Sequence, residues 1–237
     1  MIICLFDTET TGVGSADDVL ELASLLFKPG EAPVVYRQMM NPNHPIHVKA
    51  TEAHGYVDAD VRGFEDSVVV VPAWWNNVVN HAGTAEIILC AHNVSFDVRM
   101  ISRHVPGAPE LRTLCTRRLA ENVVPHSPNH KLTTLYSFLG CTEQYSAHSA
   151  LDDVKMTYHI LQKLLKLSGK SLGEIVEIQN LKNKKQRKLQ KIVSFGQFKG
   201  QPWSVVPKWY LEFVVRDVTD NVDANFTAQH YLEKLCA

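Results

Sequence analysis

Three stretches near the start of the chain are rich in apolar and β-branched residues. They cover residues 2–6, 19–27 and 33–40, and a Lys-Pro-Gly turn at residues 28–30 separates the second from the third. Apolar, β-branched runs bounded by turn residues are typical of β-strands. The pattern therefore predicts a meander of three consecutive strands.

Beyond residue 40, helical patterns alternate with two further apolar stretches. Residues 86–91 are nearly all apolar, as expected for a strand buried on both faces, and residues 112–116 favour a short fifth strand. Helices are predicted at residues 48–55, 72–81, 96–104, 116–122, 131–139 and 149–167. A meander followed by alternating strands and helices predicts an α/β fold with a mixed five-stranded sheet and helices on both faces.

The second of these helices starts on a proline that follows four consecutive valines at residues 68–71. Proline is favoured in the first turn of a helix, where a missing N–H breaks no hydrogen bond. We therefore expect the valines to form a loop that leads into a core helix with Pro72 in its first turn. Pro72 also interrupts the longest apolar run, so the chain has no stretch of the roughly 18 apolar residues that a membrane span needs.

Two acidic residues, Asp7 and Glu9, stand where the first apolar run ends. Side chains two apart on a strand point the same way, so both carboxylates face one spot at the carboxyl end of the strand. Two like charges held together are costly unless a cation lies between them, and a divalent metal is the obvious candidate. The alternative is a strand that runs into a polar turn with two acids by chance.

A second acidic position, Asp97, follows the strand predicted at residues 86–91. Asn93 or Ser95 is a plausible N-cap, so Asp97 falls in the first turn of the next helix, at the same end of the sheet as Asp7. The alternative is that Asp97 only complements the helix dipole, as many first-turn acids do.

The last helix of the body begins near Ser149 and has an apolar stripe at helical spacing, formed by Leu151, Val154, Tyr158, Leu161 and Leu165. Ser149 suits an N-cap, and Asp152 stands where the acid of a capping box would be. Asp152 points away from the stripe, whereas Asp153 lies nearer its edge and can reach a site at the core boundary. His148 precedes the cap and is free to lean over the same site, although a lone histidine is more often structural or solvated.

These fragments form an ordered set, D-x-E, H-N-x-x-F-D and H-x-x-x-x-D, which is more specific than any one of them. The set resembles the DEDDh (DnaQ-like) family of 3′–5′ exonucleases, which have an RNase H-like fold. The resemblance covers roughly residues 1–165. It implies that Asp7, Glu9, Asp97 and Asp153 are catalytic metal ligands and that His148 is the catalytic base.

The resemblance also implies the cofactor and the substrate contacts. Two metal ions are expected, and oxygen-only ligands select Mg²⁺ or Mn²⁺ over Zn²⁺. Asp7 would bridge both ions, with Glu9 and Asp153 on the nucleophile side and Asp97 on the leaving-group side. His54 and Gly55 match a recurring His-Gly of the family, although a histidine at a helix end is an equally good interpretation. The expected substrate-binding residues are Thr8, Thr10, Thr11, His54, His92, Asn93 and Phe96.

Charge is distributed unevenly along a chain whose overall net charge is only -1. Residues 1–165 hold 12 basic and 18 acidic residues, and residues 166–237 hold 12 basic and 7 acidic ones. The basic residues concentrate in residues 181–191, a segment that suits phosphate contacts or a solvated helix face. The five cysteines are scattered without a C-x-x-C, so the sequence does not support a zinc ribbon or a redox motif and favours unpaired thiols in a reducing compartment.

The end of the chain resembles the small module that follows the nuclease domain in exodeoxyribonuclease X-like members of this family. The resemblance rests on the stretches at 194–203 and 207–211, where aromatic residues interleave with Lys199. These aromatics suit either base stacking or packing of a small unit, and glutamines replace the usual basic residues at 197 and 201. We therefore expect an exonuclease domain at 1–168, a basic linker or helical segment at 169–191, and an exodeoxyribonuclease X-like module at 192–237.

The resulting prediction is a cytoplasmic, metal-dependent 3′–5′ exonuclease that hydrolyses DNA to nucleoside 5′-monophosphates in repair or replication. An exoribonuclease or oligoribonuclease would use the same five catalytic residues, so RNA remains an alternative substrate. A polymerase-associated proofreading or nucleic-acid-binding module is the second alternative. The expected partner is a DNA 3′ end and no membrane, while a homodimer and a polymerase or repair partner are left open.

Overall fold

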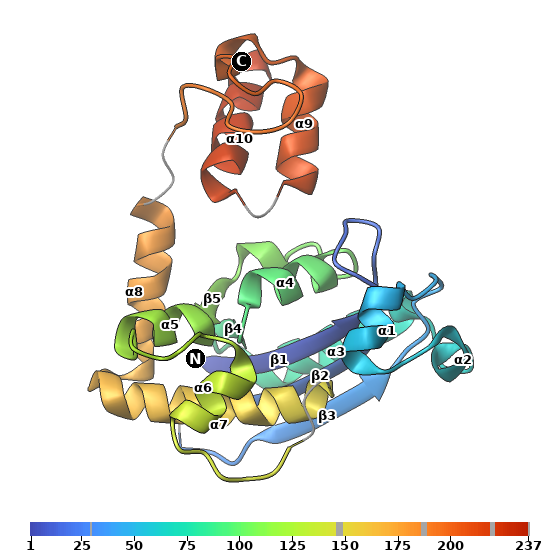
Figure 1. Ribbon diagram of the computed structural model, residues 1–237, viewed down its shortest axis with the longest axis vertical. Coiled ribbons are helices and arrows are strands. Elements are labelled where there is room, and N and C mark those ends of the chain that lie inside the picture. Colours follow the sequence, from blue (N-terminus) through green and yellow to red (C-terminus); the bar gives the residue numbers. More distant parts are fainter. Residues whose placement is uncertain (29, 146–148, 186–188, 219–220, 237) are drawn as a thin grey trace. The chain divides into compact units, whose positions relative to one another are not determined.

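The chain forms two compact units, residues 1–179 and residues 180–237, in a computed structural model (Figure 1). The structure describes residues 1–28, 30–145, 149–185, 189–218 and 221–236. In the described residues, no helix has both the length and the apolar character needed to cross a membrane.

A five-stranded sheet with the order β3-β2-β1-β4-β5 forms the centre of the first unit. The pairs β1–β2 and β2–β3 are antiparallel, whereas β1–β4 and β4–β5 are parallel. The predicted mixed sheet that begins with a meander is therefore confirmed. The strands are β1 (Ile2–Thr10), β2 (Val19–Phe27), β3 (Val34–Met39), β4 (Ile87–Ala91) and β5 (Arg112–Cys115).

Helices cover both faces of this sheet, as predicted (Figure 1). Alternate β1 side chains enter two separate cores: Cys4 and Phe6 pack with α3 and α4, and Ile3 and Leu5 pack with α5, α6 and α7. The helices of this unit are α1 (Val48–His54), α2 (Asp58–Val61), α3 (Ser67–Ala82), α4 (Val94–Ser102), α5 (Thr116–Val123), α6 (Leu132–Phe138), α7 (Ala150–Ser168) and the first half of α8 (Leu172–Lys185).

Strand β1 continues four residues beyond the end that its apolar run predicted. Asp7, Thr8 and Glu9 pair with Ala23, Leu22 and Glu21 of β2, so the backbone ladder holds the polar residues in extended conformation. Asp7 and Glu9 therefore lie within a strand rather than after it. Their side chains point to the face that α7 covers, and Thr8 points to the face that α4 covers.

The expectation for the four valines was wrong. Helix α3 starts at Ser67, so the valines form its first turns and Pro72 lies inside the helix. Burial of Val70 and Val71 in the core, next to Trp74, offsets the hydrogen bond that Pro72 cannot donate. The tertiary contacts of the valines thus outweigh their low helix propensity.

The boundary drawn from the sequence at residue 168 differs from that of the compact unit by the first half of α8. Ile175 and Val176 are buried in the same core as Ile3 and Leu5. The side-chain amide of Gln179 donates to the Cys115 carbonyl at 3.0 Å and accepts from the Cys115 N–H at 2.8 Å. These bonds satisfy backbone groups at the end of edge strand β5 and fix the first half of α8 to the sheet.

The second unit contains helices α9 (Lys208–Asp217) and α10 (Val222–Cys236) and a 3₁₀ turn at Trp203–Val205. Its small core buries Trp203 and Tyr210, so these two aromatics serve packing. Trp209 remains 55% exposed. Gly196 has φ +65°, and a Cβ there would collide with the Tyr210 hydroxyl, which requires glycine at this turn. Most of the basic segment at 181–191 has side chains outside the described residues.

Candidate active site

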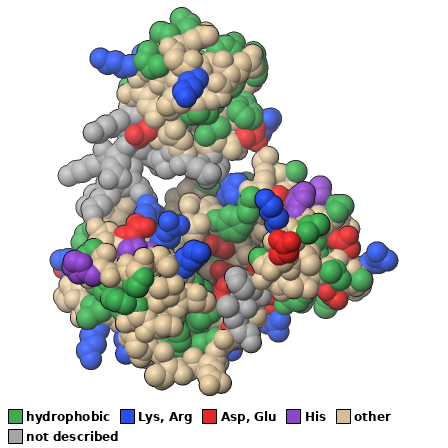
Figure 2. Space-filling view, viewed as in Figure 1, with side chains coloured by type: hydrophobic (Ala, Val, Ile, Leu, Met, Phe, Trp, Pro, Cys, Tyr) green, Lys and Arg blue, Asp and Glu red, His purple; other side chains and the backbone are tan. Residues whose placement is uncertain are grey.

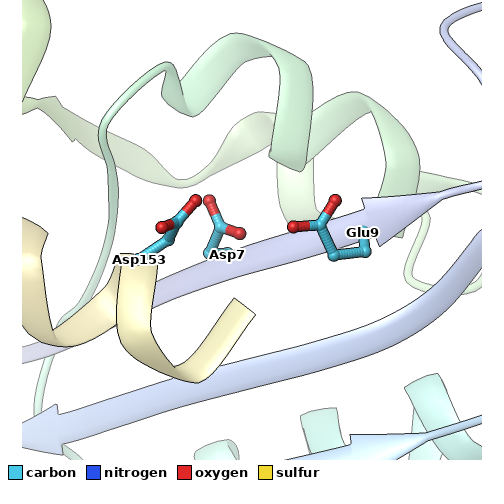
Figure 3. Close-up of side chains that lie close together, drawn as sticks. All are labelled: Asp7, Glu9 and Asp153. Atoms are coloured by element: carbon cyan, nitrogen blue, oxygen red, sulfur yellow. The ribbon is translucent and has the colours of Figure 1, made fainter. Parts of the chain in front are cut away.

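Three carboxylates converge where β1 passes the start of α7. Asp7, Glu9 and Asp153 each offer an oxygen, and these oxygens all lie within 4.8 Å of one another. Figure 3 shows Asp7 and Asp153 facing one another, with Glu9 further along β1. Two residues of one strand and one from the first turn of a helix thus form a single acidic cluster, in the arrangement that their spacing predicted.

The protein environment makes this cluster expensive to ionise without a cation. Burial, followed by repulsion from Asp97, Asp153, Glu9 and Glu21, raises the pKa of Asp7 well above its usual range. Burial, then the charges of Asp153, Glu21 and Asp97, raises the pKa of Glu9 to about 8. A divalent cation would relieve both effects, because it neutralises the carboxylates that repel one another.

Asp97 approaches the cluster from α4, on the other face of the sheet. One of its oxygens accepts from the Thr8 backbone N–H at 3.1 Å and from the Thr8 hydroxyl at 2.9 Å. Burial raises the pKa of Asp97 to about 7, although the two bonds from Thr8 oppose this rise. Asp97 does not belong to the group of three within 4.8 Å, but its charge acts on Asp7 and Glu9.

The donor set fits Mg²⁺ or Mn²⁺. All three clustered ligands are carboxylate oxygens, the donors that hard divalent cations prefer, and the described part of the chain places no cysteine or histidine among them. Raised pKa values in a recess also mark candidate functional residues in general. Figure 2 shows acidic side chains gathered in a recess of the first unit.

A cavity of about 690 Å³ adjoins the cluster at Glu9. The carboxyl end of β1, the following loop, α1 and Phe96 of α4 line it. Its walls are mostly apolar, with contributions from Val13, Val48 and Ala53. This volume and lining suit a small organic ligand held next to the carboxylates.

Four of the predicted substrate-binding residues line this cavity: Thr8, Thr10, His54 and Phe96. The His54 Nε2–H donates to the Thr10 carbonyl at 3.2 Å, and its Nδ1 accepts from the Tyr56 N–H at 3.1 Å. This pair of bonds fixes the ring against the end of β1. His54 therefore forms part of the cavity wall, whatever its role toward a ligand.

The other three predicted contacts are placed differently. Thr11 is fully buried, and its hydroxyl donates to Asp17 at 2.9 Å. His92 donates from Nε2 to the His130 carbonyl and accepts at Nδ1 from the Thr116 hydroxyl, both at 2.9 Å. Burial lowers the pKa of His92.

Asn93 is exposed at the N-cap of α4. The predicted base, His148, lies outside the described residues.

Ser149 occupies the predicted N-cap position of α7 without a side-chain cap bond, so its hydroxyl does not perform the expected capping. Asp152 accepts from Lys155 at 3.2 Å on the outer face of the helix. The apolar stripe of α7 packs on the sheet as predicted, with Val154 and Leu161 buried. The buried stripe holds the helix so that Asp153 faces β1.

The loop from Thr11 to Asp18, which forms one wall of the cavity, is held by Asp17 and Asp18, two acids outside the sequence motifs. Asp17 accepts from the Gly14 N–H at 2.6 Å and pairs with His47 at 3.1 Å. A Cβ at Gly12 would lie 2.6 Å from Asp17 Oδ2 and 2.6 Å from His47 Cδ2, so this position favours glycine. The one available signal was the pair of adjacent acids just before β2.

Asp18 ties the same loop to the two helices on that face of the sheet. It accepts from His104 at 2.7 Å, just beyond α4, and from the hydroxyl of Ser67 at 2.7 Å, at the start of α3. Burial alone would raise the pKa of Asp18, but the bonds from His104, Ser67 and the Val19 N–H outweigh it and lower the pKa. The loop, α3 and α4 are therefore held together at one carboxylate.

Replacing Asp18 with alanine is expected to lower the free energy of unfolding by about 1–3 kcal/mol at pH 7, because buried donors lose their acceptor. Since the pKa of Asp18 is lower in the folded than in the unfolded protein, its contribution is present above the usual aspartate pKa of about 3.8. The contribution is lost as the pH falls through the folded-state value. Urea unfolding at pH 7 and pH 3 measures both effects.

The control for this prediction is Glu52→Ala, at an exposed position of α1. A difference between wild type and Asp18→Ala that stays the same at both pH values would contradict the role of the charged carboxylate.

Most of the first unit matches an exonuclease family model and a segment of known DNA polymerases. A family model described as Exonuclease (RNase_T) matches residues 4–161. The PolC-type DNA polymerase III of Listeria monocytogenes is 32% identical over 171 residues, which cover 69% of this chain and 11% of that protein. The PolC-type DNA polymerase III of Bacillus subtilis is 29% identical over 168 residues, 68% of this chain and 11% of that protein. The chain thus spans about a tenth of the length of these relatives.

Solved structures show the same fold. Exonuclease X in complex with 5′ overhanging duplex DNA has a TM-score of 0.57 at 24% identity, and the match covers 74% of this chain and 98% of that one. An Escherichia coli ExoI–ssDNA complex has a TM-score of 0.59 at 15% identity, covering 77% of this chain and 43% of that one. These likenesses confirm the RNase H-like fold that the ordered motifs predicted.

Proposed function

This chain belongs to the RNase_T exonuclease family, and from that premise we propose that it is a metal-dependent 3′–5′ exonuclease that acts on DNA. It would hydrolyse phosphodiester bonds from the 3′ end and release nucleoside 5′-monophosphates, in repair or replication. The observation that carries this proposal is the cluster of Asp7, Glu9 and Asp153, whose oxygens lie within 4.8 Å of one another beside a cavity.

In this proposal Asp7, Glu9 and Asp153 hold the metal, with Asp97 as the fourth acidic ligand. When bound, Mg²⁺ or Mn²⁺ would offset charge on the phosphate and lower the pKa of a water nucleophile. The hydrogen bonds from Thr8 orient the Asp97 carboxylate towards the cluster from the α4 side. His148 would accept the proton of the attacking water, a role that suits a group with a pKa near 6.5.

The cavity next to Glu9 would receive the 3′-terminal nucleotide. Its volume of about 690 Å³ accommodates a base and a sugar, and Phe96 offers an aromatic surface for stacking. Arg99 lies with its guanidinium carbon 5.4 Å from the centre of the Phe96 ring, which steadies that ring against α4. The phosphate that follows the sugar would then lie over the carboxylates.

DNA is the proposed substrate because several of the proteins that resemble this chain are described as DNA polymerases or as complexes with DNA. The PolC-type relatives are DNA polymerases, and the exonuclease X and ExoI structures contain DNA. The alternative of a polymerase-associated proofreading module has its own support, because the matched segment is a part of PolC-type polymerases. Comigration of this protein with a polymerase during size-exclusion chromatography would favour that alternative.

The proposal predicts that a 5′-labelled DNA oligonucleotide is shortened stepwise from its 3′ end in Mg²⁺ and is left intact in EDTA. Removal of the cation should stop cleavage because the clustered carboxylates would then repel both one another and the phosphate. Gel electrophoresis of the products at successive times measures the ladder, and an RNA oligonucleotide of the same sequence is incubated in parallel.

The outcomes of this experiment are distinct. A ladder on RNA alone would replace DNA by RNA as the substrate. Shortening from the 5′ end would contradict the polarity. A lack of cleavage of both oligonucleotides in Mg²⁺ and in Mn²⁺ would overturn the enzymatic proposal and leave a binding module.

A further inference from the structure

A fifth carboxylate lies beside the cluster, and the motifs do not account for it. We infer that Glu21 of β2 is a positioning residue, which holds the first turn of α7, and with it Asp153, against β1. This inference rests on the proposed function only in taking Asp153 to be a metal ligand. Nothing in it requires a particular nucleic acid as the substrate.

Glu21 is fully buried, and both of its oxygens are in use. One accepts from the Arg37 Nε–H on β3 at 2.5 Å. The other accepts from the Tyr56 hydroxyl at 3.2 Å and from the Ala150 backbone N–H at 3.3 Å. A single carboxylate therefore joins strand β3, the segment after α1 and the start of α7.

The contact with Ala150 replaces a missing helix cap. Ala150 is the first residue of α7, where backbone N–H groups have no partner within the helix. Ser149 stands at the N-cap without a side-chain cap bond. A buried carboxylate at a helix N-terminus both accepts a free N–H and interacts favourably with the helix dipole. Glu21 thus performs from a distant strand the function that a neighbouring cap residue usually performs.

This anchor acts close to Asp153. The Asp153 N–H donates to the Ser149 carbonyl at 2.9 Å, so Asp153 and Ala150 belong to the same first turn. Across the sheet, Glu21 pairs directly with Glu9. Glu21 therefore holds α7, which carries Asp153, at the position on β2 that lies opposite Glu9. This contact sets the separation of Asp153 from β1.

The chemistry of the position argues against an incidental ion pair. Like charges directly opposite each other on neighbouring strands are destabilising, and Glu21 adds to the charges that raise the pKa of Glu9. Arg37 supplies the compensating positive charge and keeps 45% of its side chain exposed. Tyr56 also connects the anchor to the cavity, because its N–H donates to His54. A glutamate that is buried here despite its repulsion from Glu9 indicates a positioning role.

The test uses the full chain, stripped of metal, and measures Mn²⁺ binding by calorimetry without substrate. Glu21→Ala is expected to weaken Mn²⁺ binding about 10- to 100-fold, as the loss of a residue that orients metal ligands does. Glu21→Gln keeps the shape and one acceptor oxygen, so its effect should be smaller than that of alanine. Hydrogen exchange of the Ala150 amide should be faster in both variants, and most in Glu21→Ala.

The matched control is Glu86→Ala. Glu86 forms an ion pair with Arg112 at 3.2 Å, at the β5 edge of the sheet, and the substitution removes this pair. It should leave Mn²⁺ binding unchanged. Equal weakening by Gln and Ala with unchanged Ala150 exchange would assign the effect to charge alone and overturn the inference. Wild-type Mn²⁺ affinity in Glu21→Gln together with unchanged exchange would overturn it as well, even if Glu21→Ala fails to fold.

The two proposals fail separately in this design. Strong Mn²⁺ binding by wild type, weakened in the Glu21 variants, supports the positioning role even when no oligonucleotide is cleaved. Cleavage by wild type with unaltered metal binding in a folded Glu21→Ala protein retains the exonuclease and removes the anchor.

Discussion

Replacing Asp7 with asparagine should lower the rate of phosphodiester hydrolysis by at least about 10³-fold. The metal contributes several kcal/mol of charge stabilisation, and each 1.36 kcal/mol of barrier is a factor of ten. Asparagine keeps the shape of the side chain but offers a neutral oxygen to the cation, in the middle of the group formed with Glu9 and Asp153. Initial rates of oligonucleotide shortening at saturating Mg²⁺ measure the loss.

The same substitution should make the metal-free protein more stable. The pKa of Asp7 is raised by burial and by its acidic neighbours, so the folded protein holds protons that the unfolded chain releases. Stability without metal therefore falls as the pH rises from the ordinary carboxylate range towards 8, where Glu9 titrates. Asp7→Asn removes one of these groups, so its thermal midpoint in EDTA should be higher than that of wild type, and more so at pH 8 than at pH 5.

A matched control for Asp7→Asn is Glu31→Gln, which makes the same chemical change at an exposed residue between β2 and β3. It should change neither the rate nor the midpoint. If Asp7→Asn keeps wild-type activity, or if its midpoint in EDTA falls below that of wild type, the placement of Asp7 at the centre of the metal site is wrong.

Replacing His148 with alanine should lower the rate of hydrolysis by about 10²–10⁴-fold and leave Mn²⁺ affinity unchanged. A general base contributes to proton transfer but not to metal binding, so the two measurements separate His148 from the carboxylates. The wild-type rate should rise with pH through the pKa of the base, near 6.5, and the variant should lose this inflection. Rates between pH 5.5 and 8.5 measure it.

His81→Ala is the control for this substitution, because His81 is an exposed histidine in the last turn of α3. Imidazole in the buffer should restore part of the activity of His148→Ala, since it can replace the missing base, and should not affect His81→Ala. Full activity of His148→Ala at neutral pH would show that another group removes the proton.

The parts of the fold and site that the sequence predicted are those encoded by short-range spacing. The i, i+2 spacing of Asp7 and Glu9 places both carboxylates on one face of β1, and the apolar stripe of α7 orients Asp153 towards them. The meander and the alternating elements that follow gave the sheet its mixed order. Each of these inferences needs only the period of a strand or a helix.

The parts that escaped prediction depend on residues far apart in the sequence. Pro72 lies inside α3 because the preceding valines find a core, which their local pattern does not reveal. The local pattern of β2 gives no sign of what Glu21 contacts, because its partners Tyr56 and Ala150 come from two distant segments. The bond between Asp18 and His104 likewise spans 86 positions of the sequence.

Glu21 and Ala150, which are joined by a hydrogen bond, lie 129 positions apart in the sequence. This separation determines when the site can form during synthesis. A ribosome that adds about 5–20 residues per second releases β1 and the other strands well before α7. Until α7 emerges and docks, the nascent chain carries Asp7 and Glu9 without Asp153. The carboxylate cluster is therefore completed only on a nearly finished first unit, so an incomplete chain would carry only two of the three carboxylates of the proposed metal site.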